Sequence, residues 1–196
     1  MHYIYVDVTS GLILGLLDAS FNWVVYKESN EKKPSEVIHR EIHELISTNK
    51  VDKNNLEYFF SSGPGSYTGM RLGEGIAQIL EWNKATVYSF HQFEVPQLMG
   101  IQKGFWMTNA FKGQLFIYSW DSEKSTIELI NTTDVSVTNE NLGYTLSQDN
   151  ELFKNLITSK SMIAKEPAKF FKKIKELKMR KQPYYFRTLE EEFKQC

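Results

Sequence analysis

The sequence predicts an α/β protein with two lobes, and three observations lead to this expectation. Apolar strands and amphipathic helices alternate over the first hundred residues. A glycine-rich turn at 63–73 joins one of these strands to one of the helices, and a second set of three strands begins after Gly104. The 196 residues are 41% hydrophobic and 14% aromatic, which is enough to bury a core.

The first hundred residues contain elements whose type follows from the period of their apolar residues. The expected strands are 2–9, 11–18, 22–27, 56–61 and 86–88. The expected helices run from about Pro34 to Asn49, over 68–82, and over about 91–99. Three strands, helix, strand, helix, strand and helix is the order of one half of the actin/hexokinase-like ATPase fold, so we expect that fold.

The second half of the chain reads as a reduced copy of the first. Gly100 to Gly104 form the expected boundary, which gives lobes of 1–100 and 101–196. Its expected strands are 105–110, 114–121 and 126–131, with a hairpin turn at Lys112-Gly113. Beyond 132 the pattern becomes polar and predicts one or two further helices.

The glycine-rich turn has the composition of a strand-to-helix connection. Gly63 and Gly65 tolerate positive φ, and Ser66 or Thr68 can cap the helix that follows. The free N–H groups at such a helix start suit a nucleotide or another anion. However, Thr68 stands where the dinucleotide-binding pattern needs glycine, and the lysine of a P-loop is absent. The turn is therefore interpreted either as an anion loop or simply as a tight turn.

The residues of this turn also carry a family resemblance. Residues 63–73, GPGSYTGMRLG, resemble the GPGSFTGLRIG signature of the TsaB (YeaZ) family. Looser matches to that family are Tyr5-Val6-Asp7-Val8-Thr9-Ser10, His39-Arg40-Glu41 and Pro183-Tyr184-Tyr185-Phe186-Arg187. Val8 stands where the family usually has threonine, which argues against nucleotide binding at the first turn.

The resemblance implies a function that depends on partners. It implies a non-catalytic subunit of the bacterial complex that makes threonylcarbamoyladenosine on tRNA. Such a subunit pairs with a TsaD-like catalytic subunit, is joined by a TsaE-like ATPase, and reaches tRNA through the complex. The complex uses ATP, while this chain alone is expected to bind no cofactor. Two alternatives remain, a free-standing ATPase or glycoprotease-like peptidase of the same fold, and a homodimeric scaffold.

Candidate catalytic and metal-binding residues are few. His39 and His43 are four residues apart on one expected helix, but a third ligand is not near in sequence. Ser66 lacks the G-x-S-x-G context of a nucleophile. Asp7 ends the first strand, where catalytic members of the ATPase fold keep a carboxylate, and capping of the turn is an equally good interpretation. We therefore expect no catalytic residue and no metal site.

The helix at 68–82 carries a line of small residues, Gly69, Gly73 and Ala77, which lie on one face. Each mid-helix glycine costs about 0.5–1 kcal/mol relative to alanine, which implies close approach of another backbone. We interpret this face, flanked by Met70 and Ile76, as the surface for a partner helix. Leu72 and Ile79 on the other side would then serve the protein's own core. The resemblance agrees, because the first two helices form the family's interface, and this adds His39.

Charge is distributed unevenly along the chain. Residues 160–181 contain nine Lys or Arg and two Glu, a net charge of +7, while the whole chain has −1 and the remainder therefore −8. This excludes a general nucleic-acid-binding protein. The apolar residues Phe170, Phe171, Ile174 and Leu177 predict an amphipathic helix. Lys172, Lys173 and Lys175 on it are either a solvated face or an auxiliary contact with tRNA.

The expected location is the cytoplasm. The sequence lacks the run of about 20 apolar residues that spans a membrane, and Met1 to Tyr5 lack the features of a signal peptide. Its single cysteine, Cys196, allows no internal disulfide and is given no role.

Overall fold

The computed structural model describes residues 1–29, 31, 33–111, 113–134, 143–148 and 151–186. Lys112, Arg187 and Cys196 lie outside these residues. The chain divides into two units, one made of Met1–Gln92 with Ala164–Tyr184, the other of Phe93–Ile163 with the chain from Tyr185. The sequence placed a single boundary after residue 100. The structure differs because the helix near 170 buries its apolar side chains in the first unit.

The first unit is built on a five-stranded sheet in the order β3-β2-β1-β4-β5. Strands β1 to β3 pair antiparallel, and β4 and β5 continue the sheet parallel to β1. Their bounds are β1 His2–Asp7, β2 Leu12–Leu17, β3 Trp23–Ser29, β4 Leu56–Ser61 and β5 Thr86–Phe90. The strand predicted at 56–61 is thus found with the same bounds, and the three strands of the first meander are found within two residues of their predicted bounds.

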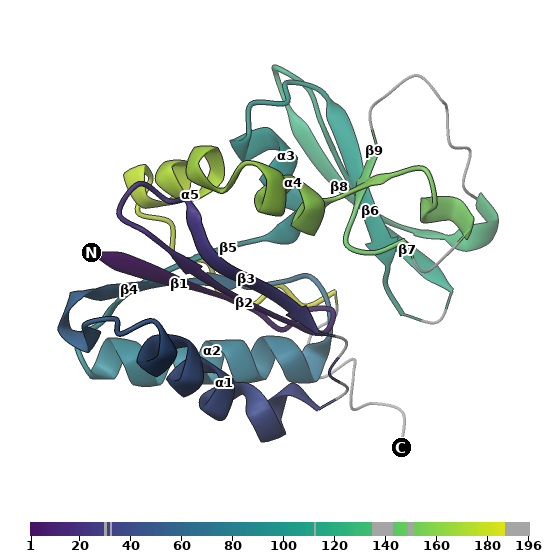
Figure 1. Cartoon of the computed structure of the whole chain (residues 1–196). Coiled ribbons are helices and arrows are strands. Elements are labelled where there is room, and N and C mark those ends of the chain that lie inside the picture. Colours follow the sequence, from purple (N-terminus) through teal and green to yellow (C-terminus); the bar gives the residue numbers. More distant parts are fainter. Residues whose placement is uncertain (30, 32, 112, 135–142, 149–150, 187–196) are drawn as a thin grey trace. The chain divides into compact units, whose positions relative to one another are not determined.

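Helices cover both faces of this sheet (Figure 1). Helices α1 (Pro34–Thr48) and α2 (Tyr67–Trp82) lie on one face, and α5 (Pro167–Glu176) lies on the other. Successive side chains of a strand point to opposite faces of the sheet. Because helices cover both faces, β1 and β2 need apolar residues on each. A short 3-10 turn, η1 (Lys53–Asn55), leads into β4.

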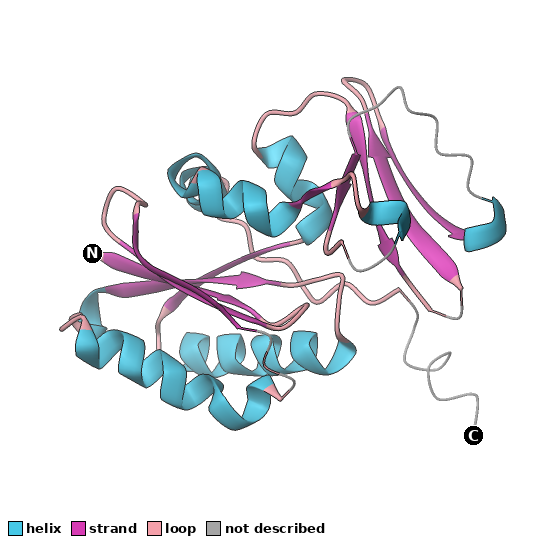
Figure 2. Cartoon of the chain, turned by 45° about the vertical axis from the view of Figure 1, so that its right-hand side comes forward, coloured by secondary structure: helices cyan, strands magenta, loops and turns pink. Residues whose placement is uncertain are grey.

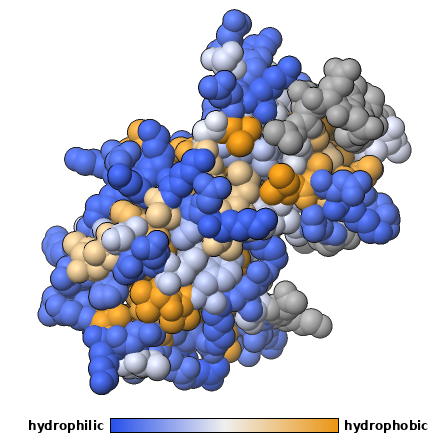
Figure 3. Space-filling view, turned by 45° about the horizontal axis from the view of Figure 1, so that its top comes forward, coloured by the Kyte–Doolittle hydropathy of each residue, from blue (hydrophilic) through white to orange (hydrophobic). Residues whose placement is uncertain are grey.

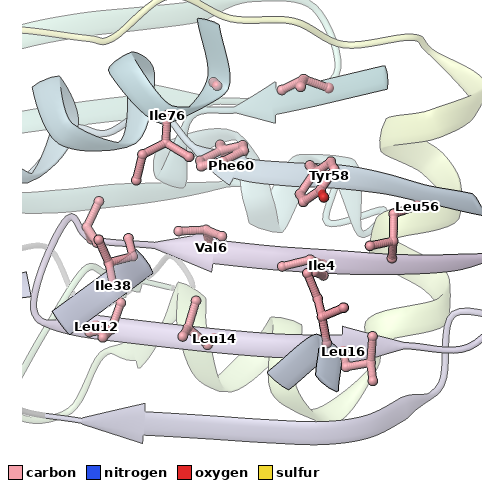
Figure 4. Close-up of a cluster of buried hydrophobic side chains, with 14 of the residues drawn as sticks. Ile4, Val6, Leu12, Leu14, Leu16, Ile38, Leu56, Tyr58, Phe60 and Ile76 are labelled. Atoms are coloured by element: carbon pink, nitrogen blue, oxygen red, sulfur yellow. The ribbon is translucent and has the colours of Figure 1, made fainter. Parts of the chain in front are cut away.

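The two faces of the first sheet have different cores. Toward α1 and α2 the core is mostly aliphatic, as Figure 4 shows for Ile4, Val6, Leu14, Ile38 and Ile76 among others. Toward α5 it is aromatic: Phe171 packs against Tyr5, Trp23 and Phe59, and Phe170 against Phe90. Alternate residues of β1 therefore serve the two cores, which explains why this strand reads as a continuous apolar run.

The second unit contains a second five-stranded sheet, visible in Figure 2, in the order β10-β9-β6-β7-β8. Strands β6 to β8 pair antiparallel, and β9 and β10 are parallel to β6. The bounds are β6 Gly104–Asn109, β7 Gln114–Trp120, β8 Ser125–Asn131, β9 Gly143–Thr145 and β10 Ile157–Thr158. The short helices are η2 Gln92–Glu94, α3 Val95–Leu98, η3 Thr132–Asp134, η4 Glu151–Phe153 and α4 Ser159–Lys165.

Both sheets follow one plan, in which three antiparallel strands are extended by two parallel ones next to the first strand. The second copy is shorter, since β9 has three residues and β10 two. This duplicated plan is the predicted actin/hexokinase-like ATPase fold with a reduced second lobe, and the fold prediction is confirmed. None of the described helices combines the length and the apolar composition needed to cross a membrane.

Candidate functional site

The glycine-rich turn connects β4 to α2 and is fixed by a helix cap. Ser66 is the N-cap residue of α2, and its Oγ accepts a hydrogen bond of 3.2 Å from the Gly69 N–H. The Ser66 N–H donates a 2.7 Å hydrogen bond to the carbonyl oxygen of Thr9. Gly63 has φ of +91°, a conformation that side chains disfavour. The predicted cap is therefore formed by Ser66, while Thr68 is exposed in the first helical turn.

The glycines of the turn are surrounded by the protein's own atoms. A Cβ on Gly65 would lie 2.6 Å from the Thr9 carbonyl oxygen, and one on Gly69 would collide with the Val8 carbonyl oxygen. A Cβ on Gly63 would meet the Met70 sulfur. Of the residues predicted to form an anion loop, Gly65 thus permits packing against the β1–β2 turn and Gly63 permits packing against Met70, and only Ser66 and Thr68 are exposed.

Asp7, at the end of β1, is buried and holds the same turn together. Its Oδ1 accepts hydrogen bonds from the Thr9 N–H at 2.8 Å and the Thr9 hydroxyl at 2.6 Å. Its Oδ2 accepts from the Tyr5 hydroxyl at 3.1 Å and from Gln92 Nε2 at 2.6 Å. Burial, followed by the charge of Asp7, raises the pKa of Tyr5 well above its usual value. These contacts agree with the interpretation of Asp7 as a turn-capping residue.

Gln92 is a residue of this network that the sequence analysis missed. It is completely buried and also donates to the Ser61 hydroxyl at 2.9 Å. No pattern in the sequence connects it to Asp7, which precedes it by 85 residues. Only the parallel pairing of β1, β4 and β5 brings the ends of these strands together.

The predicted partner surface on α2 needs correction. Its five helix residues, Gly69, Met70, Gly73, Ile76 and Ala77, are all buried in the first unit. A Cβ on Gly73 would lie 3.3 Å from Cγ2 of Val8, so the small residues allow α2 to approach the β1–β2 turn. The inference of close approach is confirmed, but the neighbouring backbone belongs to the same chain. Ile79, which was assigned to the core, is 56% exposed, whereas Leu72 packs against the core.

The opposite side of α2 is open to solvent. Arg71, Gly75, Ile79 and Trp82 are spaced by four, four and three residues and lie on one face, which we call the α2 stripe. The Trp82 side chain is 83% exposed, although tryptophan is normally among the more buried residues. A Cβ on Gly75 would meet no atom within 4 Å. The stripe is therefore an exposed, partly apolar surface of α2.

The histidines predicted on the first helix are on its surface. His39 and His43 are both exposed on α1, where Glu41 between them forms an ion pair with Lys27. This pair lowers the pKa of Glu41. In the described part of the chain, no three His, Cys, Asp or Glu side chains are grouped so that they could hold a metal ion. His39 remains available to a partner surface that includes α1.

A C-terminal segment, residues 178–184, lies beside the glycine-rich turn. The Tyr184 N–H donates to the Ser62 carbonyl oxygen at 2.8 Å, and the Lys181 carbonyl oxygen accepts from the hydroxyls of Ser62 and Ser89. Arg180 reaches α2, where it bonds to both Glu74 oxygens at 2.9 and 2.8 Å and to both Glu81 oxygens at 2.8 and 3.0 Å. The sequence analysis did not predict these contacts, because Arg180 is about a hundred residues from Glu74 and Glu81 along the chain.

Solved structures share this architecture over nearly the whole chain. A Pseudomonas aeruginosa protein described as similar to the peptidase YeaZ matches with a TM-score of 0.63 and 11% identity, over 95% of this chain and 99% of that one. YeaZ from Pseudomonas aeruginosa matches with a TM-score of 0.61 and 12% identity, over 94% and 99%. The chain therefore has the fold of YeaZ. No protein-family model and no curated protein matches its sequence.

Proposed function

We propose that this chain is a non-catalytic partner subunit of the complex that makes threonylcarbamoyladenosine on tRNA. In this proposal a TsaD-like catalytic subunit binds the α2 stripe and the adjoining exposed side of α1, including His39. A TsaE-like ATPase joins the assembly, ATP is consumed by the complex, and tRNA is reached through it. We infer a cytoplasmic location from the same role. The YeaZ fold and the signature at 63–73 support the proposal together.

The exposure of Trp82 is the observation that carries the proposal. Large aromatic side chains dominate the energy of protein interfaces because they bury much area at little entropic cost. Trp82 and Ile79 are exposed on a helix whose other face is buried, so the position of the stripe is fixed before binding. Gly75 between Arg71 and Ile79 leaves room for a partner side chain or backbone to come close.

The contacts of the glycine-rich turn favour this role over an enzyme. A free-standing ATPase or a glycoprotease-like peptidase would need polar groups directed at a substrate. Both oxygens of Asp7 instead accept hydrogen bonds from the chain itself, and Gly65 packs on Thr9. A homodimer that uses the α2 stripe is the second candidate. The exposed apolar side chains of the stripe support it as well, and the molecular mass in solution with and without the catalytic subunit distinguishes the two.

Reconstitution of the modification reaction tests the proposal. The catalytic subunit, the ATPase, tRNA, ATP and the threonylcarbamoyl-adenylate precursor system are combined with or without this chain, and the modified nucleoside is measured by mass spectrometry. We expect product only when the chain is present. Ile79→Glu should lower the yield at least tenfold, because it places a charge in the proposed interface.

Ile127→Glu is the matched control, since it makes the same replacement at an isoleucine that is 48% exposed on β8, in the second unit. It should give the wild-type yield. Product formed equally well without the chain would contradict the proposed role. Equal losses for the two variants would instead contradict the assignment of the interface to the α2 stripe.

A further inference from the structure

Helix α5 presents a cluster of lysines to solvent. Lys169, Lys172 and Lys173 are exposed on α5, Lys165 precedes it and Lys178 follows it, and we call these five the α5 basic surface. Figure 3 turns the top of Figure 1 toward the viewer and shows a face on which hydrophilic residues are interspersed with apolar ones. Lys169, Lys172 and Lys173 have the i, i+3, i+4 spacing that places side chains on one helical face.

The helix that carries these lysines is firmly held. Phe170, Phe171 and Ile174 are completely buried. The Phe170 ring lies 4.7 Å from that of Phe90, and the Phe171 ring 4.8 Å from that of Phe59. The lysines on the opposite face therefore project from a fixed platform. At 1.5 Å per residue, Lys169 and Lys173 are separated by about 6 Å along the helix axis, a spacing suited to neighbouring charges on one polymer.

Other cations of the same segment are already used inside the protein. Lys175 Nζ lies 2.7 Å from Glu57 Oε2 and 3.1 Å from the Tyr3 hydroxyl, and Arg180 clamps α2. Of the three lysines that the sequence analysis considered for a contact with tRNA, Lys175 is therefore excluded, because its ammonium group binds within the protein. Among the residues that the structure describes, Lys165, Lys172, Lys173 and Lys178 form no ion pair, and Lys169 has only an exposed one with Glu166 at 3.5 Å. Exposed pairs of this kind contribute little energy.

Helix stability does not account for the whole cluster. Cations near the C-terminus of a helix interact favourably with its dipole, which explains Lys173 and Lys175 in the last turn of α5. Lys169 is in the first turn of α5, where the same dipole disfavours a positive charge. Lys165, by contrast, is in the last turn of α4, where the dipole of that helix favours it. The first turn of α5 contains no acidic residue.

We propose that the α5 basic surface contacts the phosphate backbone of the RNA that the assembled complex binds. This inference rests on the proposed function. The lysines lie within a segment of net charge +7, whereas the rest of the chain carries −8 and repels RNA elsewhere. Lysines recognise phosphates without regard to base sequence. The surface thus adds affinity and orients the RNA, while the catalytic subunit selects the nucleotide.

The test is a salt titration of tRNA binding to the complex of this chain with the catalytic subunit. The variant Lys169→Glu/Lys172→Glu/Lys173→Glu should lower affinity at 50 mM salt at least tenfold. It should also reduce the slope of log K against log salt by about 2–3, because each phosphate contact contributes about 0.7–0.9 to it. The control Lys103→Glu/Lys124→Glu/Lys154→Glu makes the same change in net charge with exposed lysines of the second unit, and should leave the slope unchanged.

Three results would overturn the inference. The first is an unchanged slope, and the second is an equal loss in the control variant, which would indicate a general effect of charge. The third is loss of binding to phosphatidylserine vesicles with tRNA binding intact, which would assign the surface to membranes. Calorimetry of the variant with the catalytic subunit separates this inference from the proposed function. Failure of the wild-type chain to form the complex contradicts both, whereas a normal complex with an unchanged slope contradicts only the RNA contact.

Discussion

Some glycines of α2 are needed for close packing and another is not, depending on what a Cβ at each position would meet. Gly69 faces the Val8 carbonyl oxygen and Gly73 faces the Val8 side chain, so these two allow the helix to lie close to the first turn. Gly75 faces solvent, and a Cβ there touches nothing. Sequence spacing cannot distinguish these cases, because it gives the angle between residues but not the neighbour that each one meets.

Alanine at two of these positions should change stability in opposite directions. Gly69→Ala should lower the free energy of unfolding by about 1–3 kcal/mol, since the methyl group must displace the backbone of Val8. Gly75→Ala should raise it by about 0.5–1 kcal/mol through helix propensity alone. Urea unfolding followed by circular dichroism measures both. A stable Gly69→Ala variant would show that α2 does not lie against the first turn.

At the residue scale the sequence predicts caps better than contacts. The Ser66 cap and the turn-capping role of Asp7 are both local, and the residues involved are at most three apart. The face of α2 predicted to bind a partner is buried. The sequence did not reveal this, because both sides of the helix carry apolar residues and the exposed Trp82 and Ile79 look like core residues. Burial is a property of the fold and is not visible in helical periodicity.

At the scale of elements, the segment after α5 ties three parts of the first unit together. Its backbone bonds to Ser62 and Ser89 at the ends of β4 and β5, and Arg180 bridges two carboxylates of α2. The Arg180 guanidinium lowers the pKa of Glu81. A carboxyl group with a lowered pKa in the folded state stabilises the fold above its unfolded pKa, and this contribution disappears as pH falls through the folded value.

Arg180→Gln should therefore destabilise the chain in a pH-dependent way. At pH 7 we expect a loss of about 1–3 kcal/mol in the free energy of unfolding, since Glu74 and Glu81 lose a shared charged donor. The difference from wild type should shrink as pH falls through the lowered pKa of Glu81 in the folded state, because the carboxyl group then becomes protonated in the folded protein as well. Urea unfolding at pH 7 and 3.5 measures this.

Lys178→Gln is the control for this change, because Lys178 is exposed and two residues from Arg180. It should alter stability by less than about 0.5 kcal/mol at either pH. A loss for Arg180→Gln that is the same at both pH values would mean that the side chain acts by packing and not through the carboxylates.

At the same scale, most helices and strands were predictable because each repeats its apolar residues with its own period. The path of the chain after residue 163 was not predictable. Helix α5 returns to the first sheet because Phe170 and Phe171 complete an aromatic core with Phe59 and Phe90. Such contacts join positions about eighty or more residues apart, and an amphipathic pattern says only that one face is buried, not where.

At the scale of the whole molecule, two sheets with one plan come from halves that show no clear sequence repeat. Many different apolar sequences can form strands that pair and connect in the same order. The duplication is therefore visible in the strand order of the two sheets and not in their amino-acid sequences. The glycine signature, with looser matches elsewhere and the order of strands and helices, linked the sequence to the YeaZ fold, which the structure and its solved neighbours confirm. The partner role stays a prediction that depends on the surface left exposed by this fold.

Calorimetric titration of the catalytic subunit with wild-type chain, Trp82→Ala and Leu177→Ala tests the central claim most directly. Trp82 and Leu177 are both exposed, on opposite sides of the sheet, so neither change should affect folding. The account predicts saturable binding of the wild type, unchanged affinity for Leu177→Ala, and a loss of at least about thirtyfold for Trp82→Ala, equivalent to 2 kcal/mol or more at an interface hot spot. Absence of binding by the wild type, or equal affinity of all three proteins, would contradict it.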